Sequence, residues 1–464
     1  MTSKHSSFNS KLFKETFKQY YYALTVCIFA FSFYFLFNTV ACVDNYTKGG
    51  GSQYIITSLS YFLTSTNMGY PIIFFGLGIP AIMFKYLHSK KQIDLFHSIP
   101  VSRTTLFFNN YITGLLLVLP AYIISLAVSY LYAKASIPEF YLSPESVIIE
   151  ACVKLILFIL VYNISVIANI LAGNTFIGIA LSVMLIACFD LIKSTIRILI
   201  GTYFNNIHFS SYSDTNLFKN SFINNLMSFN IENFYASNLN DGSMLKIINN
   251  SSSFDYRGYT SLKQLAFLLI SYVVLAIILI FIAHFLYKKR GSESASNCLS
   301  FELSKPIFKY LGVVIFSIIG AIFVNMTFYS NYILYVALVV LCILLHCLIE
   351  AIYNFDFKAL FKNKHHIFPC IVISICILLL FKFDIFGLDN KVPVVSKIES
   401  AEILDIYSSS ESINNLPILN LSINGSILLE SEEALTALTN FHKTAVGSNP
   451  EISTNTNMYN ATNG

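Results

Sequence analysis

Long apolar runs separated by short polar stretches dominate this chain. A helix needs about 20 mostly apolar residues to cross a hydrocarbon core of about 30 Å, and most of the runs reach that length. The nine runs cover Tyr20–Val43, Thr66–Tyr86, Thr104–Tyr132, Val147–Leu171, Thr175–Gly201, Gln264–Tyr287, Pro306–Thr327, Asn331–Tyr353 and Ile367–Phe383. The pattern predicts an all-α polytopic membrane protein with about nine transmembrane helices.

The polar stretches predict smaller elements. In residues 1–19, Leu12, Phe13 and Phe17 share one helical stripe with lysines opposite, which indicates an N-terminal interfacial helix or an ordinary basic flank. A tight turn near Gly173-Asn174 joins the fourth and fifth runs. The segment 202–263 is rich in Asn and Ser and predicts a solvated loop with one short helix.

After the ninth run the periodicity changes. The stretch 417–430 holds two short apolar segments around Asn424-Gly425, the pair that favours a tight hairpin turn. Ser431 and the acids after it indicate a helix start, with Leu435 and Leu438 on the buried stripe. The sequence thus predicts a small α/β domain over 384–446 and a disordered tail over 447–464.

Charge placement predicts the orientation. The chain is 55% hydrophobic and 12% charged, unlike a soluble domain. If the N-terminus is cytoplasmic, 16 Lys and Arg fall in the cytoplasmic segments 1–19, 85–103, 288–309 and 354–366. The two short outer loops, 44–65 and 133–146, hold only Lys48 and Lys134. This bias predicts a multi-pass protein of the plasma membrane with a cytoplasmic N-terminus and an extracytoplasmic C-terminus.

Charged and polar residues inside the runs indicate packing rather than ion transport. No Asp, Glu, Lys or Arg is expected at the midplane, where an ion-coupled carrier would need one. Lys154 is expected to snorkel towards Glu150, one helical turn away. Asn163 and Asn169 are expected to hydrogen-bond between helices.

Enzyme and metal signatures are absent from the sequence. No Cys/His metal spacing occurs among the nine cysteines, and no phosphate-binding GxxxxGK(S/T) run is present. No HExxH, GxSxG or paired-carboxylate pattern stands out, so we expect no catalytic residues, no cofactor on this chain and no nucleic-acid partner. The first run is too long for a cleavable signal peptide, and no small-residue cleavage site follows it.

The loop 85–103 carries the best candidate for a functional surface. Residues 90–103 read as a short amphipathic helix broken by Pro100, after which Ser102 can cap the third span. A rigid helix lying across the membrane face, with charged and apolar groups mixed, suits docking of another protein. The same residues would also serve as a basic connector.

The stretch "KKQIDLFHSIPVSRTTLFFNNYITGLLLVLP" resembles the corresponding loop and third span of bacterial ABC-transporter permeases of the exporter superfamily. Three further stretches are similar to a Gram-positive branch with an outer C-terminal domain: "KKRGSESASNCLSFELSKPIFKY", "EAIYNFDFKALFKNK" and "FDIFGLDNKVP". The similarity spans most of residues 10–400. Two departures are Ile99 where Leu is common before the proline, and an outer domain short for the branch.

The resemblance implies a division of labour. Residues 20–287 would form a six-helix permease core, with coupling loop 85–103 and outer loop 202–263, and residues 288–383 an appended three-helix bundle. ATP and Mg would sit on a separate ABC ATPase subunit, with a second permease and membrane lipid as further partners. The residues implied to couple to the ATPase are Lys90, Lys91, Asp94, Leu95, Phe96, His97, Ile99, Pro100 and Arg103.

Three functions therefore stay open at the level of sequence. The first is the transmembrane subunit of an ATP-driven exporter for a hydrophobic or peptide-like substrate. The second is a membrane sensor or immunity protein that binds a peptide antibiotic through 384–446. The third is an ion-driven carrier, which the missing midplane charge disfavours.

Overall fold

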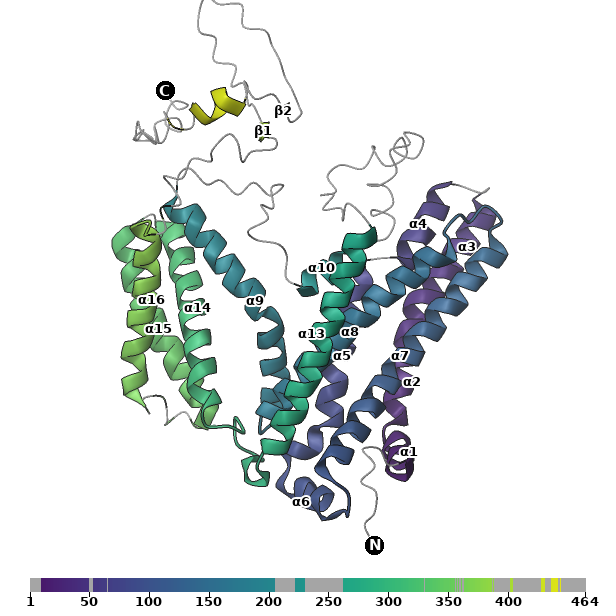
Figure 1. The fold of residues 1–464 in the computed structure, drawn as a ribbon, viewed down its shortest axis with the longest axis horizontal. Helices are drawn as coiled ribbons and strands as arrows, with labels where there is room; N and C mark the ends of the chain where they lie inside the picture. Colours follow the sequence, from purple (N-terminus) through teal and green to yellow (C-terminus); the bar gives the residue numbers. More distant parts are fainter. Residues whose placement is uncertain are drawn as a thin grey trace, which may run out of the picture. The chain divides into compact units, whose positions relative to one another are not determined.

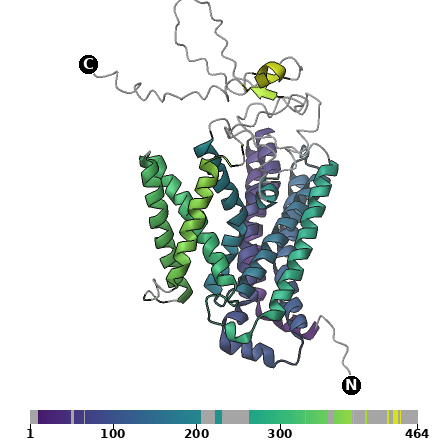
Figure 2. The same ribbon diagram turned by 60° about the vertical axis from the view of Figure 1, so that its left-hand side comes forward.

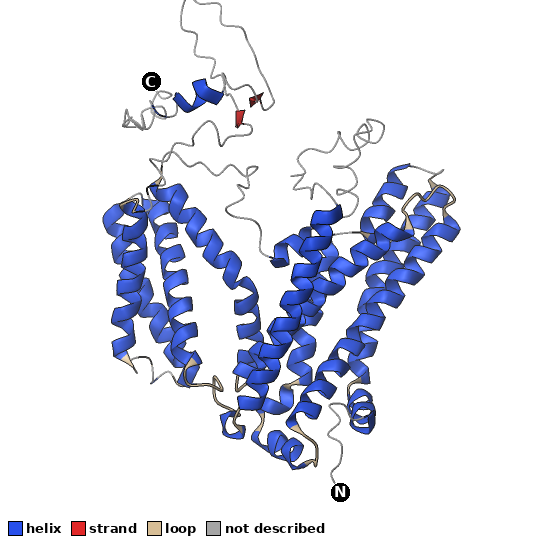
Figure 3. Ribbon diagram, viewed as in Figure 1, coloured by secondary structure: helices blue, strands red, loops and turns tan. Residues whose placement is uncertain are grey.

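The computed structural model describes residues 10–49, 53–64, 66–204, 222–229, 262–328, 330–354, 363–385, 401–403, 427–429 and 435–440, with the single residues 356, 358, 360, 387 and 443. These residues are almost entirely helical (Figure 3). The chain divides into two compact units, Met1–Thr195 with Ser211–Ile375 and Ile196–Ser210 with Cys376–Gly464. Nearly all described helices belong to the first unit, so the candidate site lies there.

Eight helical segments within the described part of the chain are long and apolar enough to cross a membrane. They are Tyr21–Lys48, Arg103–Ser136, Pro144–Leu171, Thr175–Tyr203, Ala266–Lys289, Ser304–Phe328, Tyr332–Asn354 and Lys364–Lys382. Each overlaps one of the runs predicted from the sequence. The protein is thus a helical, multi-pass membrane protein in its architecture.

The run Thr66–Tyr86 differs from the other eight. Its central helix α5, Gly69–Met83, is 15 residues long, and short 3₁₀ helices flank it at Thr66–Met68 (η2) and Lys85–His88 (η3). This helix is shorter than the roughly 20 residues of a full span. The count of nine spans is therefore not confirmed.

The N-terminal helices follow in chain order (Figure 1). Before α5 they are α1 (Ser10–Gln19), α2 (Tyr21–Ser32), the π-helical turn η1 (Phe33–Phe37), α3 (Asn38–Lys48) and α4 (Gln53–Leu63). After it come α6 (Lys90–Ser98), α7 (Arg103–Ser136), α8 (Pro144–Leu171) and α9 (Thr175–Tyr203). In α1 the stripe is confirmed, because Leu12, Phe13 and Phe17 are half-buried while Lys14 and Lys18 are exposed.

The first unit is held together by close packing around α8. Gly76 of α5 lies so near α8 that a Cβ there would be 2.7 Å from Cγ1 of Val161. Small residues allow such close approach between apolar helices. Tyr111 of α7 donates to Oδ1 of Asn163 at 2.6 Å, and Nδ2 of Asn163 donates to the carbonyl of Ala276 at 3.0 Å. Asn163 thus joins α7, α8 and α13 (Leu262–Lys289), as the sequence predicts.

The prediction for Asn169 was wrong in its partner. Its side-chain amide donates to the carbonyl of Ser165 at 2.8 Å, on the same helix. The main-chain carbonyl of Asn169 makes the contacts to other elements instead. A short polar side chain within a helix often bonds to the preceding turn in this way.

The short helix expected in 202–263 is present as α10, Phe222–Ser228. Lys154 of α8 donates to three carbonyls at its end, those of Leu226, Met227 and Phe229, at 3.1–3.2 Å. Lys154 also pairs with Glu150 at 3.0 Å. The ion pair is confirmed, but the expected snorkelling is wrong, because the Lys154 side chain is 1% exposed. Its ammonium stabilises the carbonyl end of α10 rather than reaching water.

Helices α14 (Ser304–Phe328), α15 (Asn331–Asn354) and α16 (Ile367–Lys382) lie side by side (Figures 1 and 2). Val313, Cys342 and Cys370 form the small core between them. A buried ion pair between Lys309 of α14 and Glu350 of α15 adds a polar contact at one end of this group.

In the second unit, strands β1 (Ala401–Ile403) and β2 (Ile427–Leu429) pair antiparallel, with Glu402 opposite Leu428. Residues 435–440 are helical, within the helix predicted after Ser431. The first segment of the predicted hairpin, its Asn424-Gly425 turn and the tail 447–464 lie outside the described residues. The α/β domain therefore stays a prediction.

Candidate functional site

Helix α6 has the form that the sequence predicts. It spans nine residues, Lys90–Ser98, and Ile99 after it has an extended backbone, as a residue before proline prefers. Ser102 then caps α7, since its Oγ accepts from the backbone N–H of Thr105 at 3.1 Å. The break at Pro100 makes α6 a separate short element, at the lower end of the ribbon in Figure 1.

The two faces of α6 differ sharply. Ile93 is 1% exposed, and the ring of Phe96 lies 4.5 Å from that of Tyr86 in η3. These two residues, three positions apart, anchor the helix on the protein. Outside the anchoring contacts Lys90, Lys91 and Asp94 are exposed, and Leu95 is 65% exposed. The exposed side of α6 thus combines a leucine with charged residues, on a helix whose other side is packed on the protein. Such a surface suits binding of a protein partner.

The remaining residues of the predicted coupling set take different places. Pro100 is exposed and Ile99 half-buried. The side chain of His97 lies outside the described ones. Phe96, expected as an apolar contact for a partner, belongs mostly to the anchoring face. The exposed members of the predicted set are thus Lys90, Lys91, Asp94, Leu95, Pro100 and Arg103.

Arg103 has a structural role that its sequence position did not suggest. Its guanidinium Nη1 donates to the carbonyls of Lys288 at 3.3 Å and Arg290 at 3.1 Å. These carbonyls lie at the end of α13, where helix geometry leaves acceptors without intrahelical donors. Arg103 therefore ties the start of α7 to the end of α13, while its side chain remains exposed.

The carboxyl end of α8 is buried, and each of its last four carbonyls has a partner. Ala168 accepts from the N–H of Ala172 at 2.9 Å, and Leu171 accepts from the N–H of Ser300 at 2.7 Å. The other two acceptors, Asn169 and Ile170, receive Nη1 of Arg290 at 3.0 and 2.6 Å. The last turn of α8 has no basic residue of its own, so its cation comes from the end of α13.

Arg290 also reaches the segment that leads into α6. Its Nη2 donates to the carbonyl of Leu87 at 2.8 Å. Next to it, Nε2 of His88 lies 2.9 Å from the carbonyl oxygen of Asn169, and Nδ1 lies 2.9 Å from Oγ1 of Thr175. We call the group formed by Leu87, His88, Asn169, Thr175 and Arg290 the Arg290 joint. It connects η3, α8, α9 and the end of α13.

The partners of His88 fix its protonation. A carbonyl oxygen can only accept, so Nε2 carries the proton and Nδ1 accepts from the hydroxyl of Thr175. Burial and, to a lesser extent, the charge of Arg290 lower the pKa of His88 to about 4, against the opposing effect of the Asn169 carbonyl. The imidazole is therefore neutral at physiological pH.

Arg290 is charged although it is only 3% exposed. Burial lowers its pKa to about 10, still well above neutral. The carbonyls that it contacts lie at the negative end of the α8 dipole, which stabilises the cation. The joint is thus an arrangement of one fixed charge and one neutral histidine around helix-end carbonyls.

The turn between α8 and α9 is clamped by the chain that follows Arg290. The backbone N–H of Gly173 donates to the carbonyl of Cys298 at 3.1 Å, and that of Ser296 donates to the carbonyl of Gly173 at 2.9 Å. Asn174 accepts the N–H of Phe176 at 2.9 Å and so caps α9. The turn predicted at Gly173-Asn174 is confirmed, and its fit explains why glycine occupies position 173.

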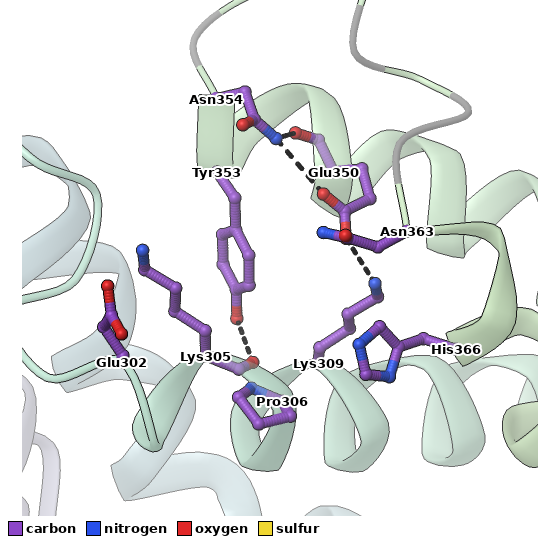
Figure 4. A pocket seen from close by; sticks show the side chains of 9 residues that line it. All are labelled: Glu302, Lys305, Pro306, Lys309, Glu350, Tyr353, Asn354, Asn363 and His366. Atoms are coloured by element: carbon purple, nitrogen blue, oxygen red, sulfur yellow. Dashed lines mark hydrogen bonds and ion pairs between the residues drawn. The ribbon is translucent and has the colours of Figure 1, made fainter.

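A second polar cluster lies in the α14–α16 group. A cavity of about 270 Å³ opens there, and Figure 4 shows the residues that line it: Glu302, Lys305, Pro306, Lys309, Glu350, Tyr353, Asn354, Asn363 and His366. Besides its pair with Lys309, Glu350 accepts Nδ2 of Asn354 at 3.1 Å. The charge at the centre of this cluster is balanced within the protein, so its clear role is to join α14 to α15.

Among the described residues, no group of three or more His, Cys, Asp or Glu could hold a metal ion. The outward face of α6 is the candidate docking surface, and the Arg290 joint holds the segment that leads into it. Sequence reasoning missed this joint, because Lys288, Lys289 and Arg290 look alike as a basic flank. The signal available was a helix, α8, with no cation at its carboxyl end.

No protein-family model, curated protein or solved structure matches this chain. The function must therefore be argued from the chain itself.

Proposed function

We propose that this chain is the transmembrane permease subunit of an ATP-driven ABC exporter of the plasma membrane. In this proposal the run Thr66–Tyr86, which contains α5, is the additional span that brings the count to nine, the N-terminus is cytoplasmic, and 384–446 forms an extracytoplasmic α/β domain. ATP and Mg bind to a separate ATPase subunit, and a second permease completes the pore for a hydrophobic or peptide-like substrate.

The observation that carries the proposal is the construction of α6. The helix is anchored by Ile93 and Phe96 and presents Lys90, Asp94 and Leu95 outwards. A connector that served only to place positive charge would need neither a buried anchor nor an exposed leucine. A partner that pushes on this face would move a firmly held element, which suits transmission of force.

The mechanism then takes the form of a shift between two arrangements of the spans. ATP-driven closure of the partner subunits displaces α6, and one arrangement of the helices is favoured over the other by its contacts with the closed ATPase. Reset follows release of the products. This chain supplies the path for the substrate and the docking surface, and the partner supplies the energy.

The test is purification of the complex that assembles on the tagged chain in its native membranes, followed by assay of Mg-dependent ATP hydrolysis. Leu95→Asp and Asp94→Lys change only exposed groups and should abolish the hydrolysis that copurifies. Lys134→Glu reverses an exposed charge at the other end of α7 and is the matched control. Wild-type complex without ATP hydrolysis, or full hydrolysis with both α6 variants, contradicts the proposal.

Orientation is tested separately. A cysteine at the exposed position Gln92 should react with a membrane-impermeant thiol reagent only after the cells are opened. Labelling from outside would reverse the topology and place α6 out of reach of an intracellular ATPase.

Deletion of 384–464 tests the alternative that this chain is a sensor. A sensor should lose its response to a peptide antibiotic while its coupling to ATP hydrolysis stays intact.

A further inference from the structure

We propose that Arg290 is the positioning residue that makes α6 move together with the ends of α8 and α13. This inference rests on the proposed function, because it concerns how a push on α6 reaches the spans. Its guanidinium contacts the end of α8 and η3, which leads into α6, and its backbone follows the end of α13 directly. Arg290 itself is buried.

The first support is the short chain distance between the joint and α6. Leu87 and His88, which meet Arg290 and the end of α8, lie two or three residues before Lys90, where α6 begins. With so little chain between them, a displacement of α6 moves the backbone of Leu87. That backbone is held by Nη2 of Arg290 at 2.8 Å.

The second support is that Arg290 follows α13 directly. The helix ends at Lys289, and Arg103 holds the carbonyls of Lys288 and Arg290 from the start of α7. The backbone of Arg290 is thus fixed to α7 while its side chain is fixed to α8 and η3. Four elements meet through one residue.

The third support is the shape of the guanidinium group. Arginine presents several N–H donors in a rigid plane, and here two nitrogens serve three carbonyls on two elements. Lysine carries the same charge on a flexible stem as a single point. The joint therefore depends on the shape of the guanidinium and not only on its charge. A variant that keeps the charge but not the shape can thus distinguish a positioning role from charge compensation.

The structure also provides a matched control. Lys154 is another buried cation that holds the carbonyl end of a helix, but its partners belong to α10 and not to the elements around α6. Loss of either cation should destabilise the protein. Only loss of Arg290 should loosen α6 relative to α13.

The experiment measures the distance distribution between spin labels at Gln92 on α6 and Lys288 on α13, both exposed. The background replaces the exposed and half-buried cysteines Cys42, Cys152, Cys188 and Cys376 by serine. We expect a narrow distribution in the wild type and in Lys154→Met, and a broad one in Arg290→Met. Arg290→Lys should also broaden it. If Arg290→Met does not fold, the Arg290→Lys result decides.

Two results would overturn the proposal. The first is a distance distribution that Arg290→Met leaves unchanged; where that variant does not fold, the same holds for Arg290→Lys. The second is equal broadening of the distribution in Lys154→Met. In the complex, the variant used should lower ATP hydrolysis at least about fivefold relative to Lys154→Met, as expected for loss of coupling between sites. Unaltered hydrolysis would also count against it. The label distances need no ATPase, so a wild-type complex without hydrolysis refutes the proposed function and leaves the positioning result standing.

Discussion

His88 and Arg290 donate to the same acceptor, the carbonyl oxygen of Asn169, at 2.9 and 3.0 Å. A positive charge on His88 would be repelled by the guanidinium of Arg290 at this shared oxygen. Arg290 carries the charge, and His88 stays neutral because burial and the charge of Arg290 lower its pKa; its second nitrogen then accepts from Thr175. This relationship makes the joint sensitive to acid.

We predict that acid destabilises the protein through His88. Its pKa is about 4 in the folded chain, below the ordinary 6.5, so the unfolded chain binds the proton more tightly. The stability that neutral His88 contributes to the fold is fully present above pH 6.5 and is lost as the pH falls towards 4. A shift of one pKa unit corresponds to about 1.36 kcal/mol, so the loss of unfolding free energy amounts to about 3 kcal/mol. Thermal unfolding in detergent across this pH range measures it.

The control for this prediction is another histidine. His88→Gln keeps a donor for the Asn169 carbonyl but cannot titrate, so the acid-dependent loss should shrink. His365→Gln changes an exposed histidine and should leave the pH dependence as in the wild type. An unchanged acid slope in His88→Gln would show that other groups cause it.

We predict that Gly173→Ala loosens the turn between α8 and α9. A Cβ there would lie 2.2 Å from the carbonyl oxygen of Asn297 and 2.6 Å from that of Ser294. Both atoms belong to backbone, so the clamping segment must move, at a cost of about 1–3 kcal/mol or more. Gly291→Ala lies in the same segment, where a Cβ meets no atom within 4 Å, and it should be neutral. Hydrogen exchange at the amides of Gly173 and Ser296 reports the difference.

We predict that the cost of removing Lys154 comes mainly from Glu150. Lys154→Met leaves a buried carboxylate without its cation, which costs about 3–5 kcal/mol. A second change, Glu150→Leu, removes that charge and should recover most of the loss of stability. The free energy of unfolding of both single variants and the double variant forms the cycle. Additive losses would show that the two residues act independently.

The same variants test how α10 is held. Its end carbonyls lose their donor in Lys154→Met whether or not Glu150 is present. Proteolysis near Met227 should therefore be faster in the single and the double variant alike. Recovery of protease resistance in the double variant would mean that packing of Met227 against Gly69 is sufficient to hold α10.

The sequence predicts the local features of this fold well. Run length gives eight of the spans, and Pro100 with Ser102 marks where α6 ends and α7 begins. These features depend on residues that are close together in the sequence, and the sequence shows which conformations such residues prefer. The anchoring of α6 was not predicted, because Phe96 was expected to contact a partner and instead packs on Tyr86.

The contacts of the candidate site are a different matter. Arg290 and Asn169 are more than a hundred positions apart, and nothing nearby distinguishes Arg290 from the lysines before it. Lys154 was expected to reach water because its partners at α10 lie in a segment without periodicity. In each case a buried cation is placed by a helix end elsewhere in the chain. A single sequence shows the unpaired helix end but not the residue that meets it.

The last prediction concerns the bridge through Asn163. Tyr111→Phe removes the donor to Oδ1, and Asn163→Leu removes the contacts to both α7 and α13. Hydrogen bonds between membrane helices contribute about 0.6 kcal/mol on average and up to about 1.7 kcal/mol. We expect Asn163→Leu to cost more than Tyr111→Phe, because it severs two contacts. Unfolding in mixed micelles measures both.

Tyr122→Phe is the matched control for the loss of a buried hydroxyl. Tyr122 is 3% exposed and packs edge-on against Phe31 at 5.6 Å between ring centroids. Within the described part of the chain its hydroxyl makes no hydrogen bond, so its removal should cost little. A loss in Tyr122→Phe equal to that in Tyr111→Phe would mean that the hydroxyl of Tyr111 contributes through burial alone. The hydrogen bond from Tyr111 to Asn163 would then have no energetic role, and α7 would be held on α8 by apolar packing.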